Sequence, residues 1–275
     1  VPAKILMDIL KSLPDQPVTI DMDDETYTVE ISSDNGRYKL TGENASDFPK
    51  VPSAEGVDDS IDMPSDVLLT AINKTVFATS NDELRPAMTG VYAALKDSNV
   101  TFVATDGHRL VKYTRVDVTS QKDATIIIPK KSLNLVKNSM PNDITNVVVK
   151  FNTQNAFFTF EGTQIICRLI DERYPDYDNV IPVDNPNKLT IDRKEFLSSV
   201  KRIAIFANKT TYQIRMKIAG SELQISAEDL DFSNKANETL TCKYIGEDLM
   251  IGFNAKFFIE LLNNLNSSEI QLKLH

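Results

Sequence analysis

Two kinds of hydrophobic pattern alternate along the chain. Five segments carry apolar side chains at helical spacing: residues 2–14, 65–80, 129–141, 191–208 and 253–265. The stretches between them place apolar side chains at alternate positions, as strands do: 26–31, 147–151, 156–160 and 223–226. Short polar turns such as Asp34-Asn35-Gly36 separate the strands and indicate hairpins. The pattern predicts an α+β fold of antiparallel sheets with helices packed on one side.

The same order of elements recurs with a period near 126 residues. The helix and strand that begin at Pro2 return from Pro129 and again from Asn254. A second landmark, around Pro49, returns around Pro175. We therefore predict three similar domains: the second half of one in residues 1–58, a complete one in 59–186 and most of a third in 187–275. A half-domain before Val1 and one or two strands after His275 are then expected to be missing.

Composition narrows the class of protein. Hydrophobic residues make up 41% of the chain and charged residues 25%, which is ordinary for a globular protein. The two cysteines, Cys167 and Cys242, are too few for a disulfide framework or a cysteine-rich zinc module. No apolar run approaches the ~18 residues that span a bilayer, and Asp8 and Lys11 make the first segment unlike a signal peptide. We expect a cytoplasmic protein that does not enter a membrane.

Charge is distributed unevenly between helices and the rest of the chain. The net charge of -9 excludes a basic coat over the whole molecule. The five helical segments nevertheless carry 11 Lys and Arg against 5 Asp and Glu. A basic face confined to one class of element is typical of a surface that follows a phosphate backbone. The alternative is that lysine merely suits exposed helix faces, although that alternative would also predict glutamate there.

A glycine turn interrupts two predicted strands at residues 103–110, VATDGHRL. Asp106 and His108 could suggest an enzymatic or metal site, but His108 is the only internal histidine. No activated nucleophile, converging ligand set or glycine-rich phosphate loop accompanies it. We therefore predict no catalytic residue, no metal and no cofactor, and an enzyme that uses Asp106 and His108 is kept as a minor alternative.

Four motifs together resemble a known family: ATDGHRL at 104–110, RPAMTGV at 85–91, RYPDY at 173–177 and IGFN at 251–254. In this order and spacing they are similar to the bacterial sliding clamp, the beta subunit of DNA polymerase III, over essentially the whole chain. The resemblance implies repeated clamp domains that pair head to tail in a homodimeric ring, with helices lining the hole. It also implies a function without catalysis. The ring would encircle duplex DNA without sequence specificity and tether the polymerase III catalytic subunit, the clamp loader and other proteins with clamp-binding peptides.

The resemblance assigns three sets of residues. The basic side chains of the helices would face DNA: Lys4, Lys11, Lys74, Lys130, Lys131, Lys137, Arg193, Lys194, Lys201, Arg202 and Lys256. A partner-peptide cleft would be lined by Met88, Thr105, Gly107, His108, Arg109, Leu110, Pro175 and Val180. The dimer interface would use Arg37, Tyr38 and Leu40 on one side and Ile205 and Phe206 on the other.

Each set leaves an alternative open. Met88 and Leu110 could be ordinary core residues, and Tyr38 and Leu40 could be alternate residues of a buried strand face. Asn179 stands where the family often has a basic residue, and the family's C-terminal Met and Pro cleft residues would lie beyond His275. The main alternative function is a tandem-domain scaffold that binds proteins and not DNA.

Overall fold

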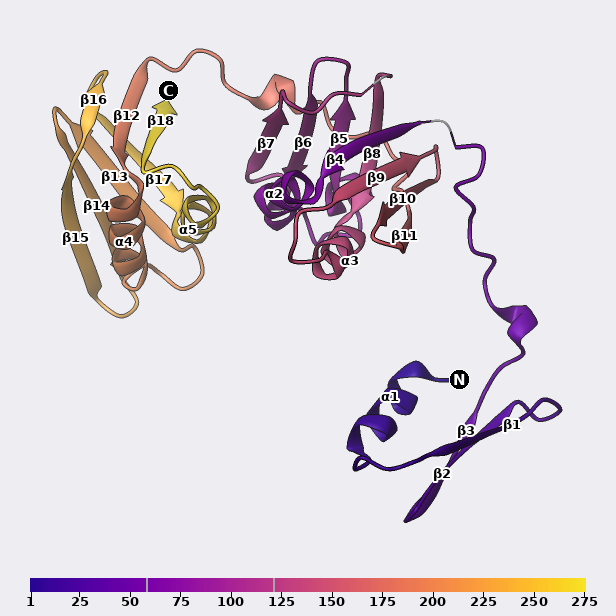
Figure 1. The fold of residues 1–275 in the computed structure, drawn as a ribbon. Coiled ribbons are helices and arrows are strands. Elements are labelled where there is room, and N and C mark those ends of the chain that lie inside the picture. Colours follow the sequence, from indigo (N-terminus) through magenta and orange to yellow (C-terminus); the bar gives the residue numbers. More distant parts are fainter. Residues whose placement is uncertain (58, 121) are drawn as a thin grey trace. The chain divides into compact units, whose positions relative to one another are not determined.

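The computed structural model describes residues 1–57, 59–120 and 122–275. These residues form two compact units, Val1–Ser53 and Ala54–His275, and each is described by itself (Figure 1).

The N-terminal unit is one helix on one small sheet. Helix α1 (Ala3–Ser12) begins after Pro2 and ends just before Pro14. Its sheet is antiparallel in the order β1-β2-β3 (Thr19–Asp23, Thr28–Ser33, Gly36–Thr41), and a short 3-10 turn, η1 (Ala45–Asp47), follows. Leu6 and Ile9 of α1 pack on Val29, Ile31 and Leu40 of the sheet. No residue of α1 is buried, so the helix covers the sheet only thinly.

The first part of the second unit contains two four-stranded antiparallel sheets and two helices. One sheet has the order β7-β6-β5-β8 (Leu110–Arg115, Val100–Thr105, Gly90–Leu95, Ala124–Pro129). The other has the order β11-β10-β9-β4 (Thr163–Arg168, Asn155–Phe160, Asn146–Phe151, Ser60–Pro64). Helices α2 (Ser65–Thr75) and α3 (Lys130–Ser139) each follow a proline that ends a strand, and three 3-10 turns complete this part: η2 (Val76–Ala78), η3 (Pro86–Thr89) and η4 (Asp178–Val180).

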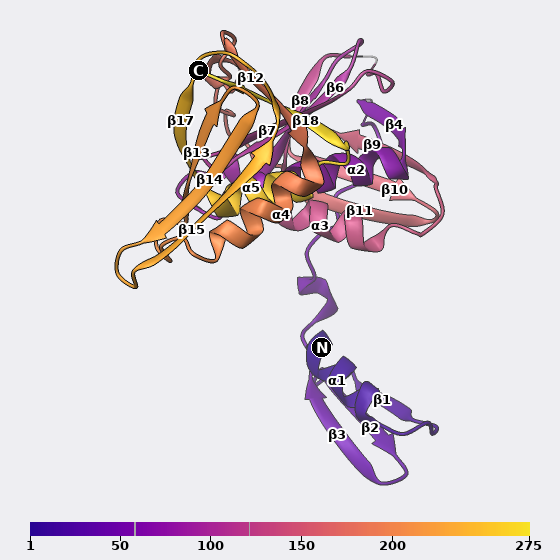
Figure 2. The same ribbon diagram turned by 90° about the vertical axis from the view of Figure 1, so that its left-hand side faces the viewer.

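The last part of the chain repeats this plan. A four-stranded sheet has the order β15-β14-β13-β17 (Asn234–Thr241, Glu222–Asp229, Gln213–Ala219, Leu249–Asn254). A three-stranded sheet has the order β16-β12-β18 (Lys243–Ile245, Asn187–Asp192, Glu269–Leu274). Helices α4 (Arg193–Ala204) and α5 (Ala255–Asn263) begin at Asp192 and Asn254, whose side chains accept a hydrogen bond from the first helical turn. The two helices lie side by side (Figure 2).

The strand orders confirm the α+β fold and the repeat. Sheets β7-β6-β5-β8 and β15-β14-β13-β17 have the same strand order. The strands of the first sheet lie between α2 and α3 along the chain, and those of the second lie between α4 and α5. Helix α1 with β1 to β3 likewise matches α3 with β9 to β11. All five predicted helices are present, with α2 tightening into η2 over its last residues. The domain boundaries at residues 58 and 186 stay a prediction.

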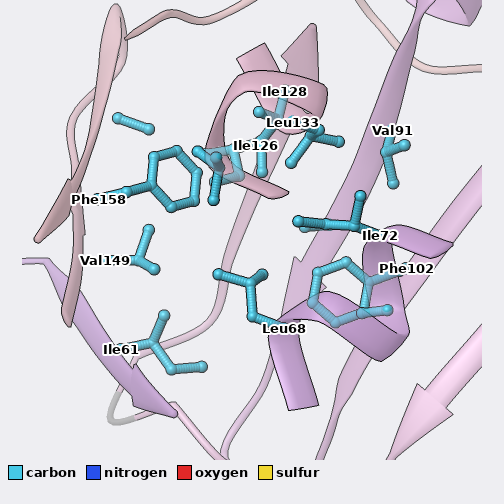
Figure 3. Close-up of a cluster of buried hydrophobic side chains, with 14 of the residues drawn as sticks. Ile61, Leu68, Ile72, Val91, Phe102, Ile126, Ile128, Leu133, Val149 and Phe158 are labelled. Atoms are coloured by element: carbon cyan, nitrogen blue, oxygen red, sulfur yellow. The ribbon is translucent and has the colours of Figure 1, made fainter. Parts of the chain in front are cut away.

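Both sheets and both helices of the first part contribute to one core (Figure 3). Leu68 and Ile72 of α2 and Leu133 of α3 pack against Phe102 from one sheet and Phe158 from the other. Burying one face of each helix in this way leaves the opposite face in solvent, and that face carries the basic side chains considered next.

Candidate nucleic-acid, peptide and dimer interfaces

Five of the predicted DNA-facing side chains are exposed and form no ion pair or hydrogen bond with the described residues: Lys4, Lys11, Lys131, Lys137 and Lys194. Three more contact only uncharged groups. Lys130 donates to Asn81 Oδ1 at 3.1 Å, Lys201 lies 3.5 Å from Asn263 Oδ1, and the Lys256 ammonium lies 3.4 Å from the centre of the Tyr212 ring. These eight cations therefore keep their charge available to a phosphate.

Lys74 and Arg193 instead hold the end of α5. Arg193 donates to the carbonyl oxygens of Leu262 at 3.1 Å and Ser267 at 2.7 Å, while Lys74 donates to the carbonyl of Asn264. Carbonyls at a helix C-terminus lack intrahelical partners and carry partial negative charge, so cations there stabilise the helix. Burial, followed by the nearby Arg193 charge, lowers the pKa of Lys74. We therefore remove both residues from the predicted DNA-facing set.

Arg202 is paired with an acidic side chain of its own chain. Its guanidinium pairs with both carboxylate oxygens of Glu238 on β15, at 2.7 Å and 2.6 Å. The hydrogen bond from Arg202 lowers the pKa of Glu238, so the pair stays ionised. A bidentate pair of this kind neutralises the positive charge that would attract a phosphate. We therefore remove Arg202 as well from the predicted DNA-facing residues.

The turn after β6 is built by Asp106. One carboxylate oxygen of Asp106 accepts the backbone N–H groups of His108 at 3.0 Å and Arg109 at 3.1 Å, and the other accepts Arg109 Nε at 3.1 Å. Thr105 is buried and its hydroxyl donates to the carbonyl of Arg109 at 2.7 Å. Gly107 has φ +88, which a side chain disfavours. These residues fix the shape of the loop, and the Asp106 carboxylate is engaged in that task.

Arg109 links this loop to α5. Its guanidinium donates to the carbonyl of Phe77 at 3.0 Å and pairs with Glu260, and it lies 4.8 Å from the centre of the Phe257 ring. His108 stacks on the same Phe257 ring with centroids 6.1 Å apart. Arg109 is half-buried by these contacts, so it positions the loop, whereas His108 remains exposed to a partner.

An aromatic cluster lies beside the loop. Tyr174 is buried against Val103 and Ile127 on the outer face of the β7-β6-β5-β8 sheet, and it stacks on Tyr92 at 4.8 Å. Burial strongly raises the pKa of Tyr174, so it stays neutral. Leu110 and Tyr177 pack on the edge of the cluster. The two tyrosines of RYPDY are structural residues that sequence reasoning did not assign, although their spacing was visible.

The other predicted cleft residues are more exposed than the cluster. Met88 and Pro175 are half-buried, and Val180 is 68% exposed in η4. Asn179 donates to Asp176 at 2.7 Å and therefore faces its own loop. A cavity of about 900 Å³ opens next to this segment, and Pro175 is the only predicted cleft residue among those that line it. Seven of the eight predicted residues thus lie on the 105–110 loop and the 175–180 segment, whereas Met88 lies on η3. Leu110, Pro175 and Val180 are the apolar side chains of the loop and the segment that stay at least partly exposed.

The predicted dimer residues divide into exposed and buried ones. Leu40 is a core residue of the N-terminal unit and Tyr38 packs on that core, so the buried-strand alternative holds for Leu40 and we remove it from the interface. Arg37 is exposed and lies 3.7 Å from Glu30. Ile205 and Phe206, just after α4, are 65% and 38% exposed. Large apolar side chains in water are candidates for a protein interface.

Three features of the described ranges bear on other functions. No group of three or more His, Cys, Asp and Glu side chains within them is arranged to hold a metal ion. No helix within them is long and apolar enough to cross a membrane. Cys167 and Cys242 are both buried free thiols, and burial raises the pKa of each.

Comparison with protein families finds three matches in order along the chain. Residues 1–52 match the DNA polymerase III beta subunit, N-terminal domain; residues 62–176 match its central domain; and residues 178–275 match its C-terminal domain. Among curated proteins, the beta sliding clamp of Synechococcus elongatus is 29% identical over 100% of this chain and 74% of its own length. That of Bacillus subtilis is 28% identical over 98% of this chain and 72% of its own.

Solved structures agree with the sequence matches. A putative DNA polymerase III beta subunit from Eubacterium rectale superposes with a TM-score of 0.90 at 26% identity, covering 100% of this chain and 74% of its own. The DNA polymerase sliding clamp from Bacillus subtilis gives a TM-score of 0.90 at 28% identity, covering 99% and 72%.

Proposed function

The chain belongs to the DNA polymerase III beta subunit family, the sliding clamps, and we propose that it works in the cytoplasm. We also propose which of its surfaces bind DNA, partner peptides and a second copy of the chain. The protein is a non-catalytic accessory subunit of DNA replication that forms a homodimeric ring around duplex DNA. It tethers the polymerase and the clamp loader. Tethering raises the effective concentration of polymerase at the primer end, so each dissociation is followed by rapid rebinding.

The DNA surface is assigned to the free cations of the helices. Helix α3 is the strongest part, because Lys130, Lys131 and Lys137 lie on it without any acidic residue. Lys4 and Lys11 of α1, Lys194 and Lys201 of α4, and Lys256 of α5 complete the set. Lysine attracts phosphate without reading bases, and a ring that slides must not stop at particular sequences.

One observation carries the assignment of function: the three domain matches follow one another in order, and the repeat of sheets and helices agrees with them. The proposed function is tested by asking whether the protein is held on DNA topologically, as a closed ring around the duplex would be. The protein, loaded by its clamp loader onto nicked circular duplex, should stay bound through a gel-filtration column and be lost once the circle is linearised. Equal retention on both forms would show surface adsorption, and no retention on either would favour the protein-binding scaffold.

The peptide surface is assigned to Leu110, Pro175 and Val180, and Met88 of η3 is kept as a fourth candidate. Aliphatic side chains of this kind supply most of the affinity for a short linear peptide, and exposed His108 would fix its orientation. Thr105, Gly107 and Arg109 shape the loop that carries His108 and Leu110. An enzyme that uses Asp106 and His108 is not supported, because the Asp106 carboxylate already accepts three hydrogen bonds.

Truncating Leu110 to alanine is expected to weaken peptide binding by roughly 1–3 kcal/mol, the usual cost of losing an apolar hot spot. Leu110 lies at the edge of the tyrosine cluster, so its side chain can be shortened without opening the buried core. Calorimetry with a polymerase-derived peptide measures the effect. Leu135→Ala on α3, which shortens an exposed leucine of the same part of the chain, is the control and should bind normally. Unchanged affinity in Leu110→Ala would remove the assignment.

A further inference from the structure

The cavity of about 900 Å³ on the outer face of the β7-β6-β5-β8 sheet has no role in the surfaces proposed above. Its lining comes from the strand ends around Leu95 and Ala124, from the turn between β9 and β10, and from the segment 169–178. Leu95 pairs with Val100 at the start of β6, whereas the 105–110 loop follows the end of β6. The cavity therefore extends towards the end of the sheet that lies away from that loop.

The apolar part of the lining is the aromatic cluster described above. It contributes two tyrosines and an isoleucine that are only partly buried, together with two side chains that are fully buried: Tyr92, Tyr177, Ile170, Ile127 and Tyr174. The three partly buried side chains leave apolar surface accessible inside the cavity. Aromatic surface of this kind suits an apolar side chain of a ligand.

The open edge of β8 borders the same cavity. Strand β8 is an edge strand, and the carbonyl oxygen of Ile127 accepts the backbone N–H of Ile170 at 3.0 Å on its outer side. Backbone groups alternate in direction along a strand, so the N–H and C=O of Thr125 also point away from β5. No hydrogen bond from another described segment reaches these two groups of Thr125. An extended peptide can add to an edge of this kind through main-chain hydrogen bonds.

The lining is acidic. Five carboxylates but only two basic side chains belong to it. Two of the carboxylates are engaged, because Asp178 pairs with Lys112 at 2.7 Å and Asp176 accepts the Asn179 amide at 2.7 Å. The other three are exposed and form no ion pair or hydrogen bond with the described residues: Asp123, Asp171 and Glu172. Their charge is therefore available to a cation.

We propose that this cavity binds an extended, basic segment of a partner protein, which adds as a strand to the edge of β8. The apolar side chains of the segment pack on the aromatic cluster, and its lysine or arginine side chains pair with the three free carboxylates. Charge excludes DNA as the occupant, because carboxylates repel phosphate. The site is separate from the proposed peptide surface, with which it shares Pro175 alone, and does not depend on that assignment.

The first test removes the charge of the lining. The probe is a fluorescein-labelled synthetic peptide of alternating lysine and valine, six residues long, and its anisotropy reports binding to the full chain. In Asp123→Asn/Asp171→Asn/Glu172→Gln the dissociation constant should rise about tenfold, because three exposed ion pairs are lost together. The matched control neutralises three exposed carboxylates of the same part of the chain outside the lining, and should bind normally: Asp62→Asn/Asp143→Asn/Glu161→Gln. An equal rise in the control, or no saturable binding to the unchanged chain, would overturn the site.

The second test blocks strand addition. Thr125→Pro removes one backbone N–H, and an edge strand tolerates proline where that N–H faces outward. Probe binding should weaken about fivefold, whereas Thr125→Val, which keeps the N–H, should bind normally. Thermal unfolding and binding of the polymerase-derived peptide should not change in either variant. Equal affinity in Thr125→Pro and Thr125→Val would overturn strand addition.

Two further measurements test the occupant. Leu110→Ala should leave binding of the lysine–valine peptide unchanged, and a loss as large as that of the polymerase-derived peptide would mean that both probes use the same surface. Spermidine carries positive charge without a peptide backbone, so it should displace the probe poorly. Full displacement at equal positive charge would identify a site for small cations and overturn the peptide. A change in the mass of the assembly in Thr125→Pro, measured by sedimentation, would show instead that the edge of β8 pairs with another copy.

Discussion

Replacing Ile205 and Phe206 by aspartate is expected to convert the homodimer into monomers. Both side chains are partly in solvent, so the monomer accepts the change, but a dimer would bury two carboxylates in an apolar contact. An uncompensated buried charge costs about 3–5 kcal/mol. A penalty of that size raises the dissociation constant by roughly two to four orders of magnitude. Light scattering at micromolar concentration should then report the monomer mass.

Two controls separate loss of the interface from loss of the fold. Met250→Asp places one carboxylate on an exposed apolar position of β17 and should remain dimeric. Monomers of the double variant should still bind the polymerase-derived peptide, because Leu110, Pro175 and Val180 are unaffected. They should lose retention on circular DNA, because an open arc cannot encircle it. A double variant that keeps the dimer mass would place the interface elsewhere.

The helices were predictable because their ends are encoded locally. Pro14 and Pro141 follow closely on α1 and α3, and Asp192 and Asn254 begin α4 and α5 through side-chain hydrogen bonds that depend only on neighbours. The period of 126 residues then allowed the domain organisation to be predicted, because a helix or strand found in one repeat could be expected at the matching position of the next.

Which cations are free was not predictable in the same way. Lys74 and Lys137 both lie in the last turn of their helices, yet Lys74 donates to Asn264, 190 residues away, and Lys137 has no such partner among the described residues. Leu40 shows the same limit for strands. The alternation of apolar and polar residues identifies the two faces of β3. Only the packing of Leu6 and Ile9 from α1 shows that the face with Leu40 is buried. Contacts between segments that are distant in the sequence therefore decide which lysines are free and which strand face is buried.

Reversing Lys130, Lys131 and Lys137 to glutamate should abolish most direct binding to DNA and greatly reduce loading. The change replaces three positive charges of α3 by three negative ones in each chain, and a homodimer doubles the effect. For every lysine–phosphate interaction that the variant cannot make, the dependence of log affinity on log salt should flatten by up to ~0.9, because fewer counterions are released. Affinity measured over a range of salt concentrations, on two unrelated duplexes, should fall equally on both, since phosphate contacts carry no base information.

The acidic net charge of -9 makes a charge-matched control essential. Lys188, Lys217 and Lys273 are exposed strand lysines without ion pairs among the described residues, and reversing them changes the net charge by the same amount. If the helix surface meets DNA, the strand variant keeps its loading and salt slope, because more negative charge on the sheets only discourages adsorption from outside. Peptide binding should be normal in both variants. Equal reductions in the two variants would mean that overall charge, and not α3, governs binding, and an intact salt slope in the α3 variant would remove its lysines from the DNA surface.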